Sequence, residues 1–146
     1  MSTSNEDAVI AIEALIQRQF KSLSWTDDVP PAFDVFASDF HCEARLFPTA
    51  RPAQAQRVDN FIERMQGLAQ SSLRQFDEKV LGSDIRVFGN IAVAAIACEQ
   101  IENGCTNNRT VEMMLLVCSE GQWKIVAQAW DKATAENALP AALLTP

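Results

Sequence analysis

The sequence has one histidine, His41, and its four cysteines form no C-x-x-C pair. Zinc sites draw several Cys and His ligands at paired spacings. The absence of such a set argues against a metal centre built from soft ligands. We therefore expect no metal and no other cofactor.

An excess of basic residues and a long hydrophobic run are also absent. Twelve Lys and Arg stand against nineteen Asp and Glu, which gives a net charge of −7. Nucleic acids and anionic membranes attract clustered Lys and Arg, so neither is an expected partner. No apolar run reaches the roughly 18 residues of a membrane helix. The first residues also lack the basic-then-apolar order of a signal peptide, and we expect a cytoplasmic protein.

What the sequence does have is enough apolar material for one globular domain. It is 146 residues long and 48% hydrophobic, which suits a single domain with its own core. Residues 1–131 carry the regular patterns and are predicted to form this domain. Residues 132–146 form a C-terminal tail, for which a short packed helix and a disordered end are both open.

Helical patterns fill the first half of the chain. The first predicted helix, capped at Thr3 or Ser4 and ending near Ser24, has apolar residues at steps of three and four. A short helix follows Pro31, and a strand is predicted over residues 42–47. Residues 54–73 show the longest amphipathic pattern and predict a third helix.

After residue 78, the hydrophobic pattern changes from the helical period to one typical of strands. Four strands are predicted, over residues 80–88, 91–101, 109–119 and 122–131. Gly89-Asn90 and Glu120-Gly121 have the composition of hairpin turns, and residues 102–108 form a polar loop. The order of elements predicts an α+β fold in which three N-terminal helices cover the concave face of a curved antiparallel sheet. The convex face is apolar too, and we expect it to form a homodimer.

Three stretches carry a resemblance to a known superfamily. They are Phe36–Pro48 (short helix, acidic turn and first strand), Gly89–Ala95 (hairpin) and Gly121–Asp131, which contains Gly-x-Trp-x-Ile. In this order they resemble the nuclear-transport-factor-2-like superfamily, in particular its SnoaL-like branch. The resemblance implies a cone-shaped half-barrel with an apolar pocket at its wide end, in a homodimer. The same fold hosts isomerases, cyclases, dehydratases and non-catalytic domains, so it does not fix the chemistry.

The sequence departs from the best-known chemistry of that superfamily. Ketosteroid isomerase combines an Asp base with a Tyr and a protonated Asp. This chain has no tyrosine, and the position of the family's base falls on Ala44. We therefore expect no close copy of that reaction.

Two carboxylates are the leading candidates for chemistry. If Ser119 pairs with Gln122 across the last hairpin, Glu112 faces Ala129 and Thr110 faces Asp131. The resemblance implies that the Trp-x-Ile side of this hairpin faces the helices, and with this register Glu112 and Asp131 then lie on the concave face. Desolvation there raises the pKa of a carboxyl group and suits it to proton transfer. Two other interpretations stay open: Asp131 is solvated at a strand end or caps the next turn, and Glu112 pairs with Arg109 or another basic group.

His41 is a third candidate, as a proton shuttle, because its ordinary pKa is near neutrality. The alternative is that it satisfies a backbone carbonyl. The expected ligand-binding side chains are aromatic or sulfur-containing: Phe20, Trp25, Phe36, Phe61, Met65, Cys98 and Met114. Trp25 could instead be a packing anchor, and the phenylalanines simply core if the barrel is filled.

The predicted function is binding of a small hydrophobic molecule, with an acid–base enzyme of isomerase, cyclase or dehydratase type as the leading hypothesis. A non-catalytic carrier or sensor and a dimerisation module are the alternatives. An open pocket with a carboxylate that lacks a cationic partner favours the enzyme. A purely apolar pocket favours the carrier, and a filled barrel favours the dimerisation module.

Overall fold

The computed structural model describes residues 4–144, which form helices, strands and one short 3-10 helix. The helices are α1 (Asn5–Leu23), α2 (Phe33–Ser38), α3 (Val58–Ala69) and η1 (Ala141–Leu143), and the strands are β1 (Phe40–Phe47), β2 (Gln56–Arg57), β3 (Phe76–Phe88), β4 (Ile91–Glu102), β5 (Cys105–Ser119) and β6 (Gln122–Lys132). The predicted α+β class is confirmed. The third helix is shorter than predicted, because residues 56–57 pair with β1 as a short strand.

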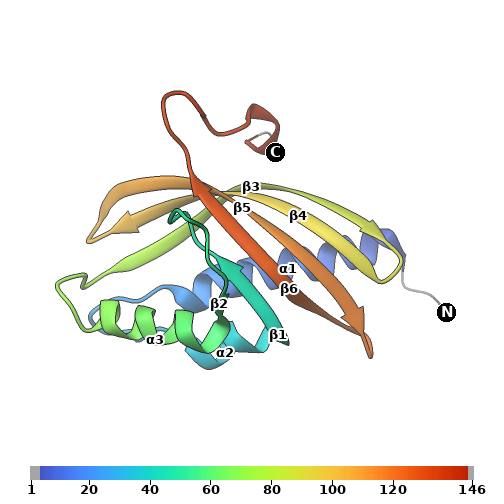
Figure 1. Cartoon of the computed structure of the whole chain (residues 1–146), viewed down its shortest axis with the longest axis horizontal. Helices are drawn as coiled ribbons and strands as arrows, with labels where there is room; N and C mark the ends of the chain where they lie inside the picture. Colours follow the sequence, from blue (N-terminus) through green and yellow to red (C-terminus); the bar gives the residue numbers. More distant parts are fainter. Residues whose placement is uncertain (1–3, 145–146) are drawn as a thin grey trace.

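The strands form one mixed sheet in the order β2-β1-β6-β5-β4-β3. Strands β3 to β6 form an antiparallel meander, whereas β1 joins β6 in parallel. The sheet curves strongly, with α1 running along its concave side and α2 and α3 lying near β1 (Figure 1). The predicted arrangement of three helices on the concave side is therefore confirmed.

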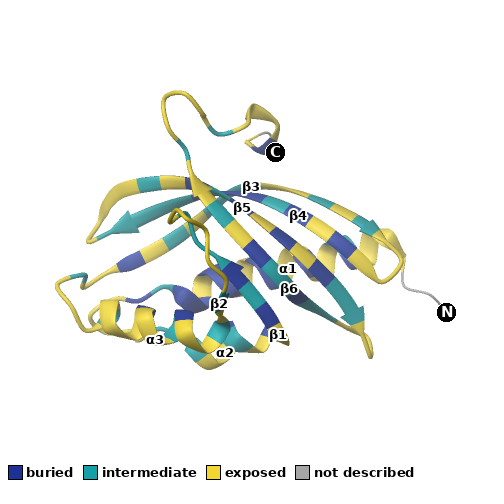
Figure 2. Cartoon of the chain, in the orientation of Figure 1, coloured by how far each residue is buried: buried dark blue, intermediate teal, exposed yellow. Residues whose placement is uncertain are grey.

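The core lies between α1 and the concave face of the sheet (Figure 2). Ser4 caps α1 by accepting a hydrogen bond from the backbone N–H of Asp7 at 3.1 Å; the alternative cap, Thr3, lies outside the described residues. From α1, Ile12 and Ile16 are almost fully buried, as is Ile96 of β4. Burying one such side chain contributes roughly 1.5–3 kcal/mol, so this layer fixes the helix to the sheet.

Tight turns connect the long strands. Asn103 and Gly104 both have positive φ values, of 50° and 83°, as a two-residue type I′ hairpin requires. The prediction of a polar loop over residues 102–108 is therefore wrong, because β4 continues to Glu102 and β5 begins at Cys105. The turn at Glu120-Gly121 also has positive φ at both residues, as its composition indicated.

A β-bulge changes the register of the last hairpin. Pairing follows the prediction from Ser119–Gln122 to Leu116–Ile125, but the next pair is Leu115–Ala127. The extra residue, Val126, turns every later side chain of β6 to the opposite face. The predicted pairs of Glu112 with Ala129 and Thr110 with Asp131 are therefore wrong.

After the bulge, Glu112 pairs with Trp130, and Val111 pairs with Asp131. Gln128 and Trp130 thus lie on the concave face, whereas Asp131 lies on the convex face. A similar bulge in β3, at Leu81, separates the pair Val80–Cys98 from the pair Gly82–Ala97.

The tail packs on the convex face, on the side of the sheet away from the helices (Figure 1). Leu143 of η1 is buried there. Its carbonyl oxygen would lie 1.5 Å from a Cβ atom built on Gly82, so only glycine allows this approach. Of the two alternatives for the tail, the structure shows the short packed helix.

We expect Gly82→Ala to detach the tail, because the added methyl group cannot coexist with the Leu143 carbonyl. The free energy of unfolding should fall by about 1–2 kcal/mol as Leu143 loses its burial. Amide hydrogen exchange at Leu143 and Leu144, whose N–H groups donate to Pro140 and Ala141, should accelerate.

Gly67→Ala is the matched control. A Cβ on Gly67 meets nothing within 4 Å, and Ala is more favourable than Gly within a helix by roughly 0.5–1 kcal/mol. This variant should be slightly more stable with an unchanged tail. Unchanged amide protection in Gly82→Ala would contradict the role assigned to the glycine.

Candidate functional site

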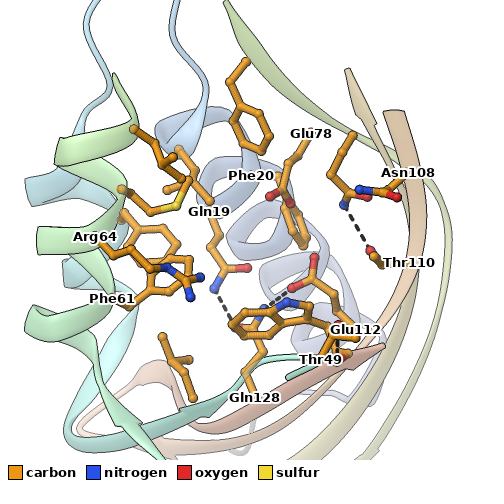
Figure 3. Close-up of a pocket in the computed structure, with 18 of the residues that line it drawn as sticks. Gln19, Phe20, Thr49, Phe61, Arg64, Glu78, Asn108, Thr110, Glu112 and Gln128 are labelled. Atoms are coloured by element: carbon orange, nitrogen blue, oxygen red, sulfur yellow. Dashed lines mark hydrogen bonds between the residues drawn. The ribbon is translucent and has the colours of Figure 1, made fainter. Parts of the chain in front are cut away.

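A cavity of about 200 Å³ lies between the helices and the concave face of the sheet (Figure 3). Phe36, Phe61 and Trp130 form an aromatic wall, with ring centroids 5.6 Å apart for Phe36–Phe61 and 5.7 Å apart for Phe61–Trp130. The polar lining residues are Gln19, Thr49, Arg64, Glu78, Gln100, Glu102, Asn108, Thr110, Glu112, Gln128 and Lys132. The cavity is therefore open, and one wall is apolar while another is polar.

Glu112 sits in the polar wall at the end of a chain of amide side chains. The Nε2 group of Gln128 donates to Glu112 Oε1 at 2.7 Å, and Nε2 of Gln19 donates to Gln128 Oε1 at 2.9 Å. Glu112 is 6% exposed and Gln19 is 1% exposed. The chain links β5, β6 and α1, so it holds the carboxyl group in one position (Figure 3).

Glu78 is the second carboxyl group of the cavity. It comes from β3, and its carboxyl group lies on the same side of the cavity as that of Glu112 (Figure 3). The residue is half-buried, yet its Oε2 atom is completely buried and has no hydrogen-bond partner. Two carboxyl groups thus share one space that water reaches poorly.

Burial shifts the ionisation of both groups. Burial raises the pKa of Glu112 to about 7, although hydrogen bonds with Gln128, Cys98 and Glu78 oppose the shift. Burial and the neighbouring Glu112 charge raise the pKa of Glu78 well above its usual range. Near neutral pH the pair therefore retains a proton, with Glu78 as its main holder, and Glu112 is partly ionised.

Among the described residues, no Lys or Arg nitrogen lies within 4.0 Å of the carboxyl group of Glu78 or Glu112. The proposed pairing of Glu112 with Arg109 is wrong, since Arg109 lies 3.6 Å from Glu99. The cations in the lining, Arg64 and Lys132, are exposed.

The other two catalytic candidates, Asp131 and His41, do not line the cavity. Asp131 lies on the convex face, 59% exposed and 3.2 Å from Arg51, because the bulge at Val126 reverses its direction. His41 is outside the lining. Its Nδ1 atom accepts a hydrogen bond from the backbone N–H of Glu43 at 3.1 Å, not the carbonyl contact considered from the sequence.

The ligand-binding candidates divide into two groups. Phe20, Phe36, Phe61 and Met65 line the cavity as predicted, but Trp25, Cys98 and Met114 do not. Trp25 is a packing anchor: its Nε1 donates to the Leu73 carbonyl at 2.9 Å, and its ring lies 5.0 Å from that of Phe76. Cys98 and Met114 are buried in the sheet behind the lining, and burial raises the pKa of the Cys98 thiol.

Sequence reasoning missed Gln19, Glu78 and Gln128. For Gln19 a signal was present, since it falls on the apolar stripe of α1 between Ile16 and Leu23. A polar residue in such a stripe is buried and needs a partner. For Glu78 and Gln128 no signal existed, because the bulges that turn them inward leave no mark in the alternation.

Neither a metal cluster nor a membrane helix is found within residues 4–144. No group of three or more His, Cys, Asp or Glu side chains there could hold a metal ion. None of the helices in that range is long and apolar enough to cross a membrane.

Replacing Glu78 by Gln should stabilise the protein at high pH. Both carboxyl groups have a pKa raised above the usual 4.5. The stability associated with each is fully present below that value and is lost as pH rises through the folded pKa. Glu78→Gln removes one such loss, so the free energy of unfolding should rise by about 2 kcal/mol at pH 8.5 and little at pH 4.5.

Urea unfolding at the two pH values measures this difference. Glu63→Gln, on the exposed side of α3, is the matched control and should change little at either pH. An equal effect of Glu78→Gln at both pH values would show that the carboxyl group is not desolvated in the fold.

Comparison with known proteins agrees with this architecture. Residues 7–131 match the model of a protein family described as "Putative lumazine-binding". No curated protein sequence matches the chain.

Solved structures share the fold at low sequence identity. One of unknown function with a cystatin-like fold, from Nostoc punctiforme, has a TM-score of 0.72 at 11% identity and covers 92% of this chain and 97% of that one. An NTF-2-like protein of unknown function from Silicibacter pomeroyi has a TM-score of 0.64 at 17% identity, with 89% and 99% covered. A structure titled "Putative Scytalone Dehydratase", from Novosphingobium aromaticivorans, has a TM-score of 0.69 at 14% identity, with 89% and 87% covered.

At these low sequence identities, the similarity shows only the fold. It confirms the NTF2-like architecture. The family match covers most of the chain. The chain therefore belongs to the family described as "Putative lumazine-binding", built on an NTF2-like α+β fold.

Proposed function

We propose that this chain binds a small ring-containing molecule in its cavity and moves protons on it, with Glu112 as the proton-transfer group. The family description supports binding of a small heterocyclic molecule. The structural likeness to a protein titled as a dehydratase is in keeping with proton chemistry in this fold, though it carries no residue assignment.

The observation that carries the proposal is the buried position of Glu112 in the cavity wall. Its carboxyl group lies in an open cavity, has no cationic partner among the described residues, and has its pKa raised to about 7 by burial. A group with a pKa near the working pH is an effective general acid or base. A purely apolar carrier has no use for two uncompensated carboxyl groups, and a dimerisation module has no need of a cavity.

Two carboxyl groups that share a proton can complete an isomerisation. The ionised Glu112 takes a proton from a C–H group of the ligand. Glu78, which holds the proton of the pair, can then donate it elsewhere on the ligand. Because the Glu112 charge raises the pKa of Glu78, transfer between the two carboxyl groups restores the starting state. Gln128 keeps Glu112 in place throughout.

A generic substrate for a buried carboxylate base tests this proposal. In 5-nitrobenzisoxazole, removal of the C3 proton breaks the N–O bond and releases a coloured phenolate. We expect the protein to accelerate this reaction, with a rate that rises with pH through about 7 as Glu112 ionises. Glu112→Gln should lower the protein-dependent rate by roughly 10²–10⁴-fold.

The control is again Glu63→Gln, which alters a carboxylate on the exposed side of α3, outside the cavity lining. It should leave both the rate and its pH dependence unchanged. Equal rates for the wild type and Glu112→Gln would refute the role of Glu112.

The proposal includes a homodimer formed through the convex face. Val93, Met113 and Leu115 expose 50%, 61% and 45% of their surface there. Small residues lie beside them on the neighbouring strands: Ala95 and Ala129 pair with Met113, and Ala127 pairs with Leu115. Such a patch can pack against its own copy across a twofold axis.

Light scattering after size-exclusion chromatography should give a dimer mass for the wild type. Met113→Glu should give a monomer, because the charge would be buried in the interface. Ile10→Glu, at an equally exposed apolar position on α1, should remain a dimer. A monomeric wild type would contradict this part of the proposal.

A further inference from the structure

The polar wall of the cavity contains hydrogen-bond acceptors that have no donor among the described residues. Gln19 Oε1, Glu78 Oε2 and Gln100 Oε1 are each completely buried, and no hydrogen-bond donor reaches them. They come from α1, β3 and β4, and all three residues line the same cavity. A buried acceptor without a donor costs about 1–3 kcal/mol, so a molecule that fills the cavity gains by supplying donors.

Glu112 determines which way the side-chain amides of Gln128 and Gln19 are oriented. This orientation leaves Gln19 Oε1 without a donor. An ionised carboxylate can only accept, so Gln128 presents its NH₂ group to Glu112. The Gln128 carbonyl then accepts from the NH₂ group of Gln19. The carbonyl oxygen of Gln19 is left over, at the end of the chain.

Gln100 is oriented in a comparable way from the next strands. Its Nε2 group donates to Thr110 Oγ1 at 3.0 Å. Its carbonyl oxygen is thereby left without a donor. Two independent amide groups thus present oxygen rather than nitrogen.

The charges of the lining favour the same kind of ligand. The interior holds the Glu78–Glu112 pair with no ion-pair partner among the described residues. The exposed Arg64 lies over the Phe61 ring, with its guanidinium carbon 5.4 Å from the ring centroid. An aromatic wall beside a negatively charged pair is suited to a flat ring that carries positive charge.

We infer that the ligand of this cavity is a neutral or cationic ring compound that directs N–H or O–H donors at the amide oxygens of Gln19 and Gln100, and that the cavity rejects carboxylates. The inference rests on the proposed function, because it names the class of molecule for that same site. The cavity volume of about 200 Å³ is below that of pockets for drug-sized ligands. It restricts the ring system of the ligand to one ring or two fused rings.

Three compounds of one shape test the inference. Benzamidinium offers only donors and a positive charge, benzamide offers both donors and an acceptor, and benzoate offers only acceptors and a negative charge. Titration of ¹⁵N-labelled protein at pH 8, followed by NMR, gives a Kd for each. The side-chain NH₂ signals of Gln19, Gln100 and Gln128 report whether the compound lies in the cavity.

We expect benzamidinium to bind at least about tenfold more tightly than benzoate, with benzamide between them, because one charge-assisted hydrogen bond is worth about that factor. Gln100→Met removes one acceptor and should weaken benzamidinium about tenfold while leaving benzoate unchanged. Gln66→Met, on the exposed side of α3, should change neither. The wild-type comparison stands even if Gln100→Met does not fold.

The outcomes separate this inference from the proposed function. Binding of benzoate as tight as that of benzamidinium, with shifts of the cavity signals, would overturn the ligand class and leave a ligand-binding cavity. Failure of all three compounds to move the cavity signals would overturn small-molecule binding itself, and the ligand class with it.

Discussion

The burial of Glu112 without a counter-charge is the constraint around which the cavity is organised. A charge removed from water is strongly destabilising unless it is paired or hydrogen-bonded. Here the compensation comes from amide hydrogen bonds and from a proton shared with Glu78, not from a salt bridge. A salt bridge would hold the carboxyl group ionised at all physiological pH values. The amide chain instead leaves it able to gain and lose a proton near neutrality.

Two β-bulges bring this arrangement together. With regular alternation, Glu78 would share the face of Gly82 on the convex side, and Gln128 would point away from the helices. The bulges at Leu81 and Val126 reverse these directions. Each inserts one residue and moves a polar side chain from the outer face to the cavity. The polar wall thus depends on two local irregularities of the sheet.

The fold of this chain tolerates wide variation in sequence. The similar structures share the architecture at identities of 11–17%, because a layer of apolar side chains between α1 and the sheet can be built from many sequences. A site with amide carbonyls and carboxyl groups but no tyrosine presents acceptors to its ligand, and this distinguishes it chemically from a site that stabilises an oxyanion.

The sequence by itself determined the α+β class, the hairpin at Glu120-Gly121 and the apolar helix faces that carry Phe36 and Phe61 of the aromatic wall. Those features follow from apolar periodicity and from turn residues, which act over a few neighbouring positions. The tertiary structure alone decided that Asp131 faces outward and that Gln19, Glu78 and Gln128 surround Glu112. A bulge depends on how one strand fits its neighbours, and a pKa depends on which distant groups are brought together, so neither is written in local sequence.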